Sequence, residues 1–235
     1  MTVVLPPSIV NISLFGSGAR NDNDAKSDLD ILVIVENGTG KTEPDPVREF
    51  VKAEFGKEPS LSWYGLRKIR ALFESGDLFA WHLCLEGKTL AGMSLQKLFG
   101  TPADYRSAQS DICDLRGIAS RVERWVTACH ANAVFELGIL YVCARNVAMA
   151  ASWRLRRTPS FGRYSPFELP IPFPIALETY EKMLQCRMAS QRGSIPPDVA
   201  ASEVLEVQRD LLIWCDEVAG AVAKVEATDE QISTI

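Results

Sequence analysis

The sequence predicts an α+β protein, in which a small mixed β-sheet domain with flanking helices precedes an all-α helical bundle. In the first hundred residues, short runs rich in Ile, Val and Leu alternate with Gly- and Pro-containing breaks, which indicates strands and helices of one sheet domain. From residue 105 onward, apolar residues recur with helical spacing over long segments. The Gly100-Thr-Pro segment lies between these patterns and predicts two domains, residues 1–102 and 103–235.

The elements of the first domain follow from apolar runs and their breaks. Two strands are expected around a polar, Gly-containing loop whose first turn is compatible with a helix start. Pro46 suits the first position of a helix, and the apolar residues after it recur with helical spacing. In chain order, the predicted elements are strands at 12–15, 29–35 and 60–64, with helices at 46–55, 67–86 and 94–99 and a short extended piece within 87–92.

The second domain is predicted to contain four long helices, which is enough for a bundle. Residues 159–174 contain five prolines, so this segment cannot be helical throughout and is expected to wrap a surface. Residues 228–235 are expected to fray. The predicted helices cover residues 105–128, 133–156, 175–191 and 197–225.

Composition restricts the class of partner and the compartment. The net charge of -5 argues against a large non-specific nucleic-acid surface and remains compatible with a small phosphate-bearing ligand. Six scattered cysteines form no CxxC pair, which favours reduced thiols and a cytoplasmic protein. The longest apolar stretch, residues 131–153, is interrupted by polar and charged residues, so a buried helix explains it better than a membrane span.

The residues with the clearest chemical pattern lie in the two N-terminal strands and the loop between them. Gly16 allows close approach of the backbone to a phosphate, and Ser17 offers a hydroxyl and an N–H where a helix could begin. Residues two apart on a strand point to the same side, so Asp28 and Asp30 would present two carboxylates together. A phosphate-binding turn beside paired carboxylates suits magnesium and a nucleoside triphosphate. Taken alone, each motif also fits a solvated turn or strand edge.

The order and spacing of these motifs resemble those of the nucleotidyltransferase superfamily, whose fold is shared by polymerase beta and aminoglycoside nucleotidyltransferases. Gly-Ser follows a strand, Arg20 stands three residues after Ser17, and Ser27-Asp-x-Asp opens the next strand, most like the minimal and aminoglycoside branches. The resemblance implies that Gly16, Ser17, Arg20 and Ser27 contact the nucleotide, with Arg20 binding phosphate or acting structurally, and that Asp28 and Asp30 are catalytic metal ligands.

The sequence departs from this family in its acidic residues. Catalytic members usually have a third carboxylate on a later strand, but residues 60–64 contain none and the nearest acid is Glu58. In some aminoglycoside-modifying relatives the general base comes from the helical domain, which makes Glu136 a candidate catalytic residue. The alternative is that Glu136 pairs with an arginine of a neighbouring helix or with a capping group.

The helical domain resembles the HEPN family more loosely, through residues 140–150 and 161–168. HEPN ribonucleases require a histidine shortly after an Arg-Asn pair, and Arg145-Asn146 is followed by no histidine in that window, so RNA cleavage is not expected. Arg145 and Asn146 are expected to organise the bundle core or line a cleft. His82, between apolar neighbours, is expected to be structural.

These observations predict a magnesium-dependent enzyme that transfers a nucleoside monophosphate, AMP from ATP, to a hydroxyl of a small molecule or protein. The alternative is a catalytically impaired, nucleotide-binding regulatory or antitoxin-like module. No membrane association is expected, and nucleic-acid tailing is disfavoured by the acidic balance. The acceptor and the preferred base stay undetermined, and apolar helical surface leaves a homodimer open.

Overall fold

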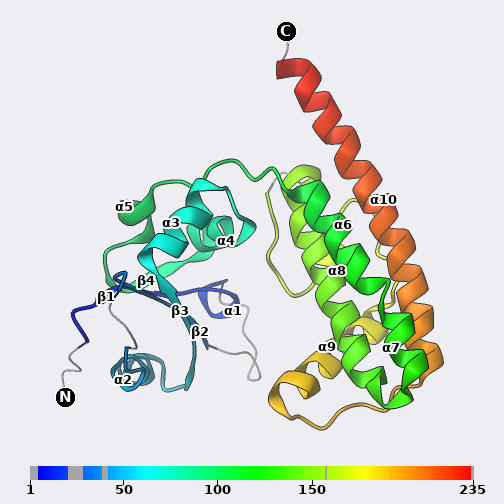
Figure 1. Ribbon diagram of the computed structural model, residues 1–235, viewed down its shortest axis with the longest axis horizontal. Coiled ribbons are helices and arrows are strands. Elements are labelled where there is room, and N and C mark those ends of the chain that lie inside the picture. Colours follow the sequence, from blue (N-terminus) through cyan, green and yellow to red (C-terminus); the bar gives the residue numbers. More distant parts are fainter. Residues whose placement is uncertain (1–4, 21–28, 39–41, 157, 234–235) are drawn as a thin grey trace. The chain divides into compact units, whose positions relative to one another are not determined.

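The computed structural model describes residues 5–20, 29–38, 42–156 and 158–233, without the side chains of residues 192 and 229–233. It confirms the predicted α+β class, with a four-stranded mixed sheet in the N-terminal part and helices in the C-terminal part (Figure 1). The chain forms two compact units, residues 1–105 and 106–235.

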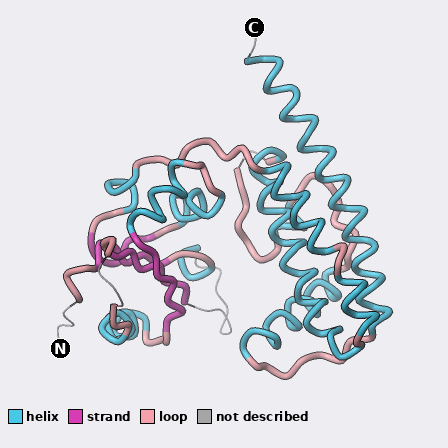
Figure 2. The backbone as a smooth tube through the Cα atoms, in the orientation of Figure 1, coloured by secondary structure: helices cyan, strands magenta, loops and turns pink. Residues whose placement is uncertain are grey.

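The first unit is built on one sheet, whose strands are magenta in Figure 2. Its strand order is β3-β2-β1-β4. The strands are β1 (Ile9–Leu14), β2 (Leu29–Val35), β3 (Pro59–Gly65) and β4 (Lys88–Gly92). β1 pairs antiparallel with β2 and β4, whereas β2 and β3 run parallel. The bounds of β2 equal the predicted ones, and β1 begins three residues before the prediction and ends one residue before it.

Helices cover both faces of this sheet, so alternate residues of the central strand β2 enter different cores. On one face, Leu29, Ile31 and Val33 pack with Val47 and Val51 of α2 (Asp45–Phe55). On the other face, Leu32 and Ile34 pack in one cluster with apolar residues of α3 (Leu66–Glu74) and α4 (Leu78–Glu86). Figure 1 shows α2 on one side of the strands and α3 and α4 on the other. The short helices are α1 (Ser17–Arg20) and α5 (Leu95–Phe99).

The single helix predicted at residues 67–86 is wrong, because the chain breaks between α3 and α4. Gly76 has φ +68°, and a Cβ atom there would lie 2.3 Å from the Asp104 carbonyl oxygen, so this position requires glycine. Asp77 then caps α4 by accepting a hydrogen bond of 2.8 Å from the Phe79 N–H. The break turns α4 back over the sheet instead of extending α3 away from it.

The second unit is a helical bundle around α8 (Ala133–Leu155). The helix predicted at residues 105–128 is wrong, because it breaks near Ser120, whose hydroxyl donates to the Gly117 carbonyl at 2.9 Å. The predicted fraying of residues 228–235 is wrong as far as Ser233, because α10 continues to that residue. The other elements are α6 (Ala108–Ala119), α7 (Val122–Ala128), η1 (His130–Asn132), η2 (Ser165–Glu168), α9 (Leu177–Arg192) and α10 (Ala201–Ser233).

α8 is the central core helix of this unit. Among the described residues, only the helical stretch 130–155 has the length and apolarity of a membrane-crossing segment, and 61% of its most apolar window is buried inside the protein. Cys143 of α8 and Cys215 of α10 are buried, and burial raises the pKa of both thiols to about 12. The predicted buried helix and buried reduced thiols are therefore found in the same core.

Candidate functional site

The turn after β1 brings the Gly16 backbone against the carboxylate of Asp30. The Phe15 N–H donates to the Asp30 carbonyl oxygen at 3.1 Å, which joins the end of β1 to the start of β2. Gly16 has φ +69°, and a Cβ atom there would lie 3.0 Å from Asp30 Oδ2. Both the backbone conformation and the closeness of the carboxylate therefore require glycine.

Helix α1 begins at this turn, where two backbone N–H groups have no backbone acceptor in the described part of the chain. The N–H groups of Ala19 and Arg20 both donate to the Gly16 carbonyl, at 3.1 and 3.2 Å. The preceding N–H groups, of Ser17 and Gly18, have no backbone acceptor among the described residues, as is usual in the first turn of a helix. The turn thus offers N–H donors for an anion next to a carboxylate that would repel it, an arrangement that suits an anion accompanied by a cation.

The paired carboxylates expected from the sequence are described only in part. Ser27 and Asp28 lie outside the described residues, whereas Asp30 lies on β2 and is partly exposed. Leu29, Ile31 and Val33 pack on the α2 side of the sheet, so strand alternation directs Asp30 to the other side. Within the described part of the chain, no group of three or more His, Cys, Asp or Glu residues is arranged to hold a metal ion.

Arg20 lies in an ion pair with Glu86, the last residue of α4. Arg20 Nη1 donates to Glu86 Oε2 at 2.6 Å, and His82 Nε2 lies 2.9 Å from the same oxygen. Burial alone raises the pKa of Glu86, but its interactions with His82 and Arg20 outweigh burial and lower that pKa below its usual range. This geometry supports the structural role considered for Arg20 more than the phosphate-binding one.

His82 of α4 packs against two aromatic rings, one of them from Phe15 at the end of β1. The His82 ring lies 5.9 Å from the ring of Phe15 and 6.3 Å from that of Phe79, both edge-on. His82 is buried and has the structural surroundings expected from the sequence. Glu86 is not among the site residues expected from the sequence, although it lies four residues after His82 on one helix, a spacing at which side chains interact.

We expect Glu86→Gln to lower the free energy of unfolding by about 1–3 kcal/mol at neutral pH, because Arg20 and His82 lose a shared anionic acceptor. The folded-state pKa of Glu86 lies below its ordinary value of 4.5, so its stabilisation is complete above that value and is lost as the pH falls through the folded pKa. Urea unfolding at about pH 7 and about pH 3 measures the effect. If the free energy of unfolding differs between wild type and Glu86→Gln by the same amount at both pH values, this prediction is wrong.

The sequence comparison covers this turn, the first three strands and the start of α4. Residues 5–80 match the nucleotidyltransferase domain family. No curated protein matches the chain. The match supports membership of residues 5–80 in the nucleotidyltransferase superfamily and, in general terms, a nucleotidyl-transfer function. The resemblance of the helical unit to HEPN proteins stays a prediction.

The segment that matches the nucleotidyltransferase family has no carboxylate on β3 beside Asp30. In the parallel register of β2 and β3, Asp30 is paired with Ser60. Glu58, the nearest acid in the sequence, accepts hydrogen bonds from Arg48 at 3.1 Å and Lys52 at 3.3 Å, and these interactions lower its pKa. Glu58 is therefore an exposed residue that pairs with α2. The third carboxylate that the sequence lacks is not supplied at the β3 position paired with Asp30, which is Ser60.

Glu136 lies outside the nucleotidyltransferase domain, in the first turn of α8. Its residue surface is only 7% exposed, and burial raises the pKa of its carboxyl group. Among the described residues no hydrogen bond or ion pair reaches this carboxylate, so the arginine pairing considered from the sequence is not found there. A carboxylate with a raised pKa is a stronger base than an ordinary carboxylate, which suits it to accept a proton.

Proposed function

We propose that this protein transfers a nucleoside monophosphate, AMP from ATP, to a hydroxyl group of a small molecule or a protein. The observation that carries the proposal is the contact between the Gly16 turn and Asp30, where a Cβ atom would lie 3.0 Å from the carboxylate. The match of residues 5–80 to the nucleotidyltransferase domain supports the same reaction class. The hydroxyl acceptor and the use of ATP are parts of the proposal that rest on the resemblance of the motif alone.

Each residue of the turn has a defined part in the proposed site. The N–H groups at the start of α1, with the Ser17 hydroxyl, bind triphosphate oxygens, while Gly16 keeps the backbone close enough for this contact. Asp28 and Asp30 hold magnesium, which when bound neutralises phosphate charge and stabilises the leaving pyrophosphate. Ser27 contacts the nucleotide beside Asp28, and Arg20 keeps α1 in place through Glu86.

The residues at the turn fit a magnesium-bound triphosphate. Asp30 provides hard carboxylate oxygens, which magnesium prefers, and no side chain at position 16 separates them from the backbone donors. Glu136 is proposed as the general base that removes the proton of the acceptor hydroxyl, since its carboxyl group is buried and its pKa is raised.

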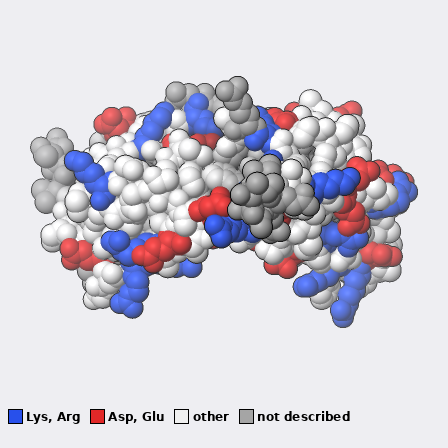
Figure 3. Space-filling model, turned by 90° about the horizontal axis from the view of Figure 1, so that it is seen from above, with Lys and Arg blue, Asp and Glu red and all other residues white. Residues whose placement is uncertain are grey.

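A second candidate function is a nucleotide-binding regulatory or antitoxin-like module that has lost turnover. The observation that favours it is the serine at position 60, paired with Asp30 where catalytic relatives carry a third acid. Nucleic-acid tailing is the weaker alternative, because Lys and Arg side chains are interspersed with Asp and Glu on the face drawn in Figure 3.

The proposal is tested by titrating ATP with magnesium into the wild type and into Asp28→Ala/Asp30→Ala while pyrophosphate release is followed. We expect magnesium-dependent binding and release in the wild type, and loss of both in the double variant. Glu58→Gln is a matched control, since it removes an exposed carboxylate of the same domain that pairs with α2. Binding without release would favour the regulatory module, and absence of binding would reject both functions.

A further inference from the structure

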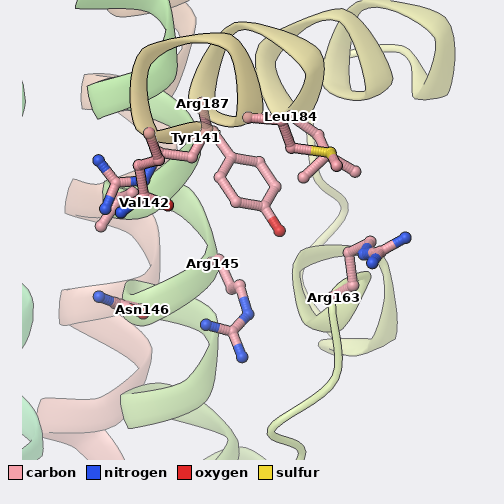
Figure 4. Close-up of a pocket in the computed structure, with 9 residues that line it drawn as sticks. Tyr141, Val142, Arg145, Asn146, Arg163, Leu184 and Arg187 are labelled. Carbon is pink, nitrogen blue, oxygen red and sulfur yellow. The ribbon is translucent and has the colours of Figure 1, made fainter. Parts of the chain in front are cut away.

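The helical unit contains a pocket of about 360 Å³ between α8, α9 and the segment that follows the proline at position 159 (Figure 4). This volume is at the lower end of the range for small-molecule sites. All its described lining residues belong to the second unit. The polar lining consists of Tyr141, Arg145, Asn146, Arg163, Arg187 and Gln191.

The lining is strongly cationic although the chain as a whole has a net charge of -5. Three arginines contribute, and no acidic residue from the described part of the chain lines the pocket. Arg145 and Arg187 form no ion pair with an acidic side chain in the described part of the chain. A pocket lined by several arginines favours an anionic ligand, because a guanidinium group can donate two parallel hydrogen bonds to one anion.

Contacts around the pocket hold the cationic side chains and their backbone in place. Arg145 Nη2 donates to the Phe161 carbonyl at 2.9 Å, which leaves other N–H groups of this guanidinium for a ligand. The Tyr180 hydroxyl donates to the Arg163 carbonyl at 2.7 Å and so fixes the backbone of the facing segment. This order before binding reduces the entropic cost of holding a ligand.

Helix packing and an aromatic wall define the remaining sides. At Gly138 the helices approach so closely that a Cβ atom would lie 3.0 Å from the Arg187 Cα atom, which places Arg187 against α8. The Tyr141 and Tyr180 rings lie 5.2 Å apart. Figure 4 shows the Tyr141 hydroxyl directed into the space between Arg145 and the segment that carries Arg163. A hydroxyl donor thus joins the guanidinium groups at the pocket.

We propose that this pocket binds a small phosphorylated molecule, with its phosphate or diphosphate group on Arg145, Arg163 and Arg187. Several guanidinium groups match the charge and multiple oxygens of a phosphate better than those of a single carboxylate. The side-chain amides of Asn146 and Gln191 can donate to and accept from the polar group attached to the phosphate. The bounded volume favours a small molecule over an RNA strand, which requires a continuous basic groove.

Isothermal titration of pyrophosphate into the full chain tests the proposal. The titration is done in EDTA on the chain with Asp30 intact, because this carboxylate repels an anion from the Gly16 turn when no cation is present. Failure of the proposed transferase function would therefore not affect the result. Arg163→Gln and Arg187→Gln are the test variants. Arg209→Gln is the matched control, because Arg209 lies on α10 and is exposed.

We expect one saturable site whose affinity falls roughly tenfold or more in each test variant and is unchanged in the control. Circular dichroism of each variant verifies folding, and Arg187→Lys, which retains the charge but not the planar fork, is expected to lose less affinity than Arg187→Gln. Absence of saturable binding, or equal binding in all variants, would overturn the proposal. Equal affinity for malonate would overturn the phosphate class, and tighter binding of a short RNA would reassign the pocket to nucleic acid.

Discussion

Gly16→Ala is expected to lower nucleotidyl-transfer turnover by roughly a hundredfold while the protein remains folded. The added Cβ atom would lie 3.0 Å from Asp30 Oδ2, closer than ordinary van der Waals contact, and the backbone there has φ +69°. The turn or the Asp30 carboxylate must therefore move, which separates the backbone donors from the proposed metal ligand. Steady-state measurement of pyrophosphate release, with ATP titration in parallel, gives the size of the effect.

Another glycine provides a matched control for this substitution. Gly56 has φ +64° with nothing within 4 Å of a Cβ atom, so Gly56→Ala has the cost of the left-handed backbone without a nearby carboxylate. Gly56→Ala should retain most of the activity. Equal losses of turnover in Gly16→Ala and Gly56→Ala would show that the approach to Asp30 is not what matters.

Glu136→Gln is expected to reduce turnover by about 10²–10⁴-fold and to leave the affinity for ATP with magnesium nearly unchanged. The amide keeps the size of the side chain but cannot accept a proton from an acceptor hydroxyl. Burial raises the pKa of this carboxyl group, which suits it to a general base. Single-turnover kinetics and ATP titration separate the two effects, and loss of both activity and binding, or of neither, would reject the assignment.

Stability measurements provide an independent control for Glu136. Its folded-state pKa is raised above the usual 4.5, so the folded protein binds the proton more tightly and loses stability as the pH rises from the unfolded towards the folded pKa. Glu136→Gln should therefore be more stable than the wild type at neutral pH, and this advantage should disappear in acid. Glu178→Gln alters an exposed acid in the first turn of α9 and should show neither effect.

Local patterns explain which parts of the fold were predictable. The bounds of β2 and the packing of Leu29, Ile31 and Val33 on one face follow from strand alternation, which needs only neighbouring residues. The helices that broke near Gly76 and Ser120 were predicted as continuous because helical periodicity carries through a break. At Gly76 the break involves a close approach to the Asp104 carbonyl, which lies 28 residues away in the sequence. Near Ser120 it involves a local side-chain hydrogen bond, which the spacing of apolar residues does not reveal.

Local spacing and residue type are enough to predict the α+β class, the strand that presents Asp30 and the glycine turn beside it. The partners of these residues depend on tertiary packing. Arg20 meets Glu86 across 66 positions of the chain, and Ser60 stands opposite Asp30 through the register of β2 and β3. Likewise, α8, α9 and the segment around Arg163 assemble the arginine pocket. Such contacts depend on how separate elements pack, which the spacing of residues along one element does not specify.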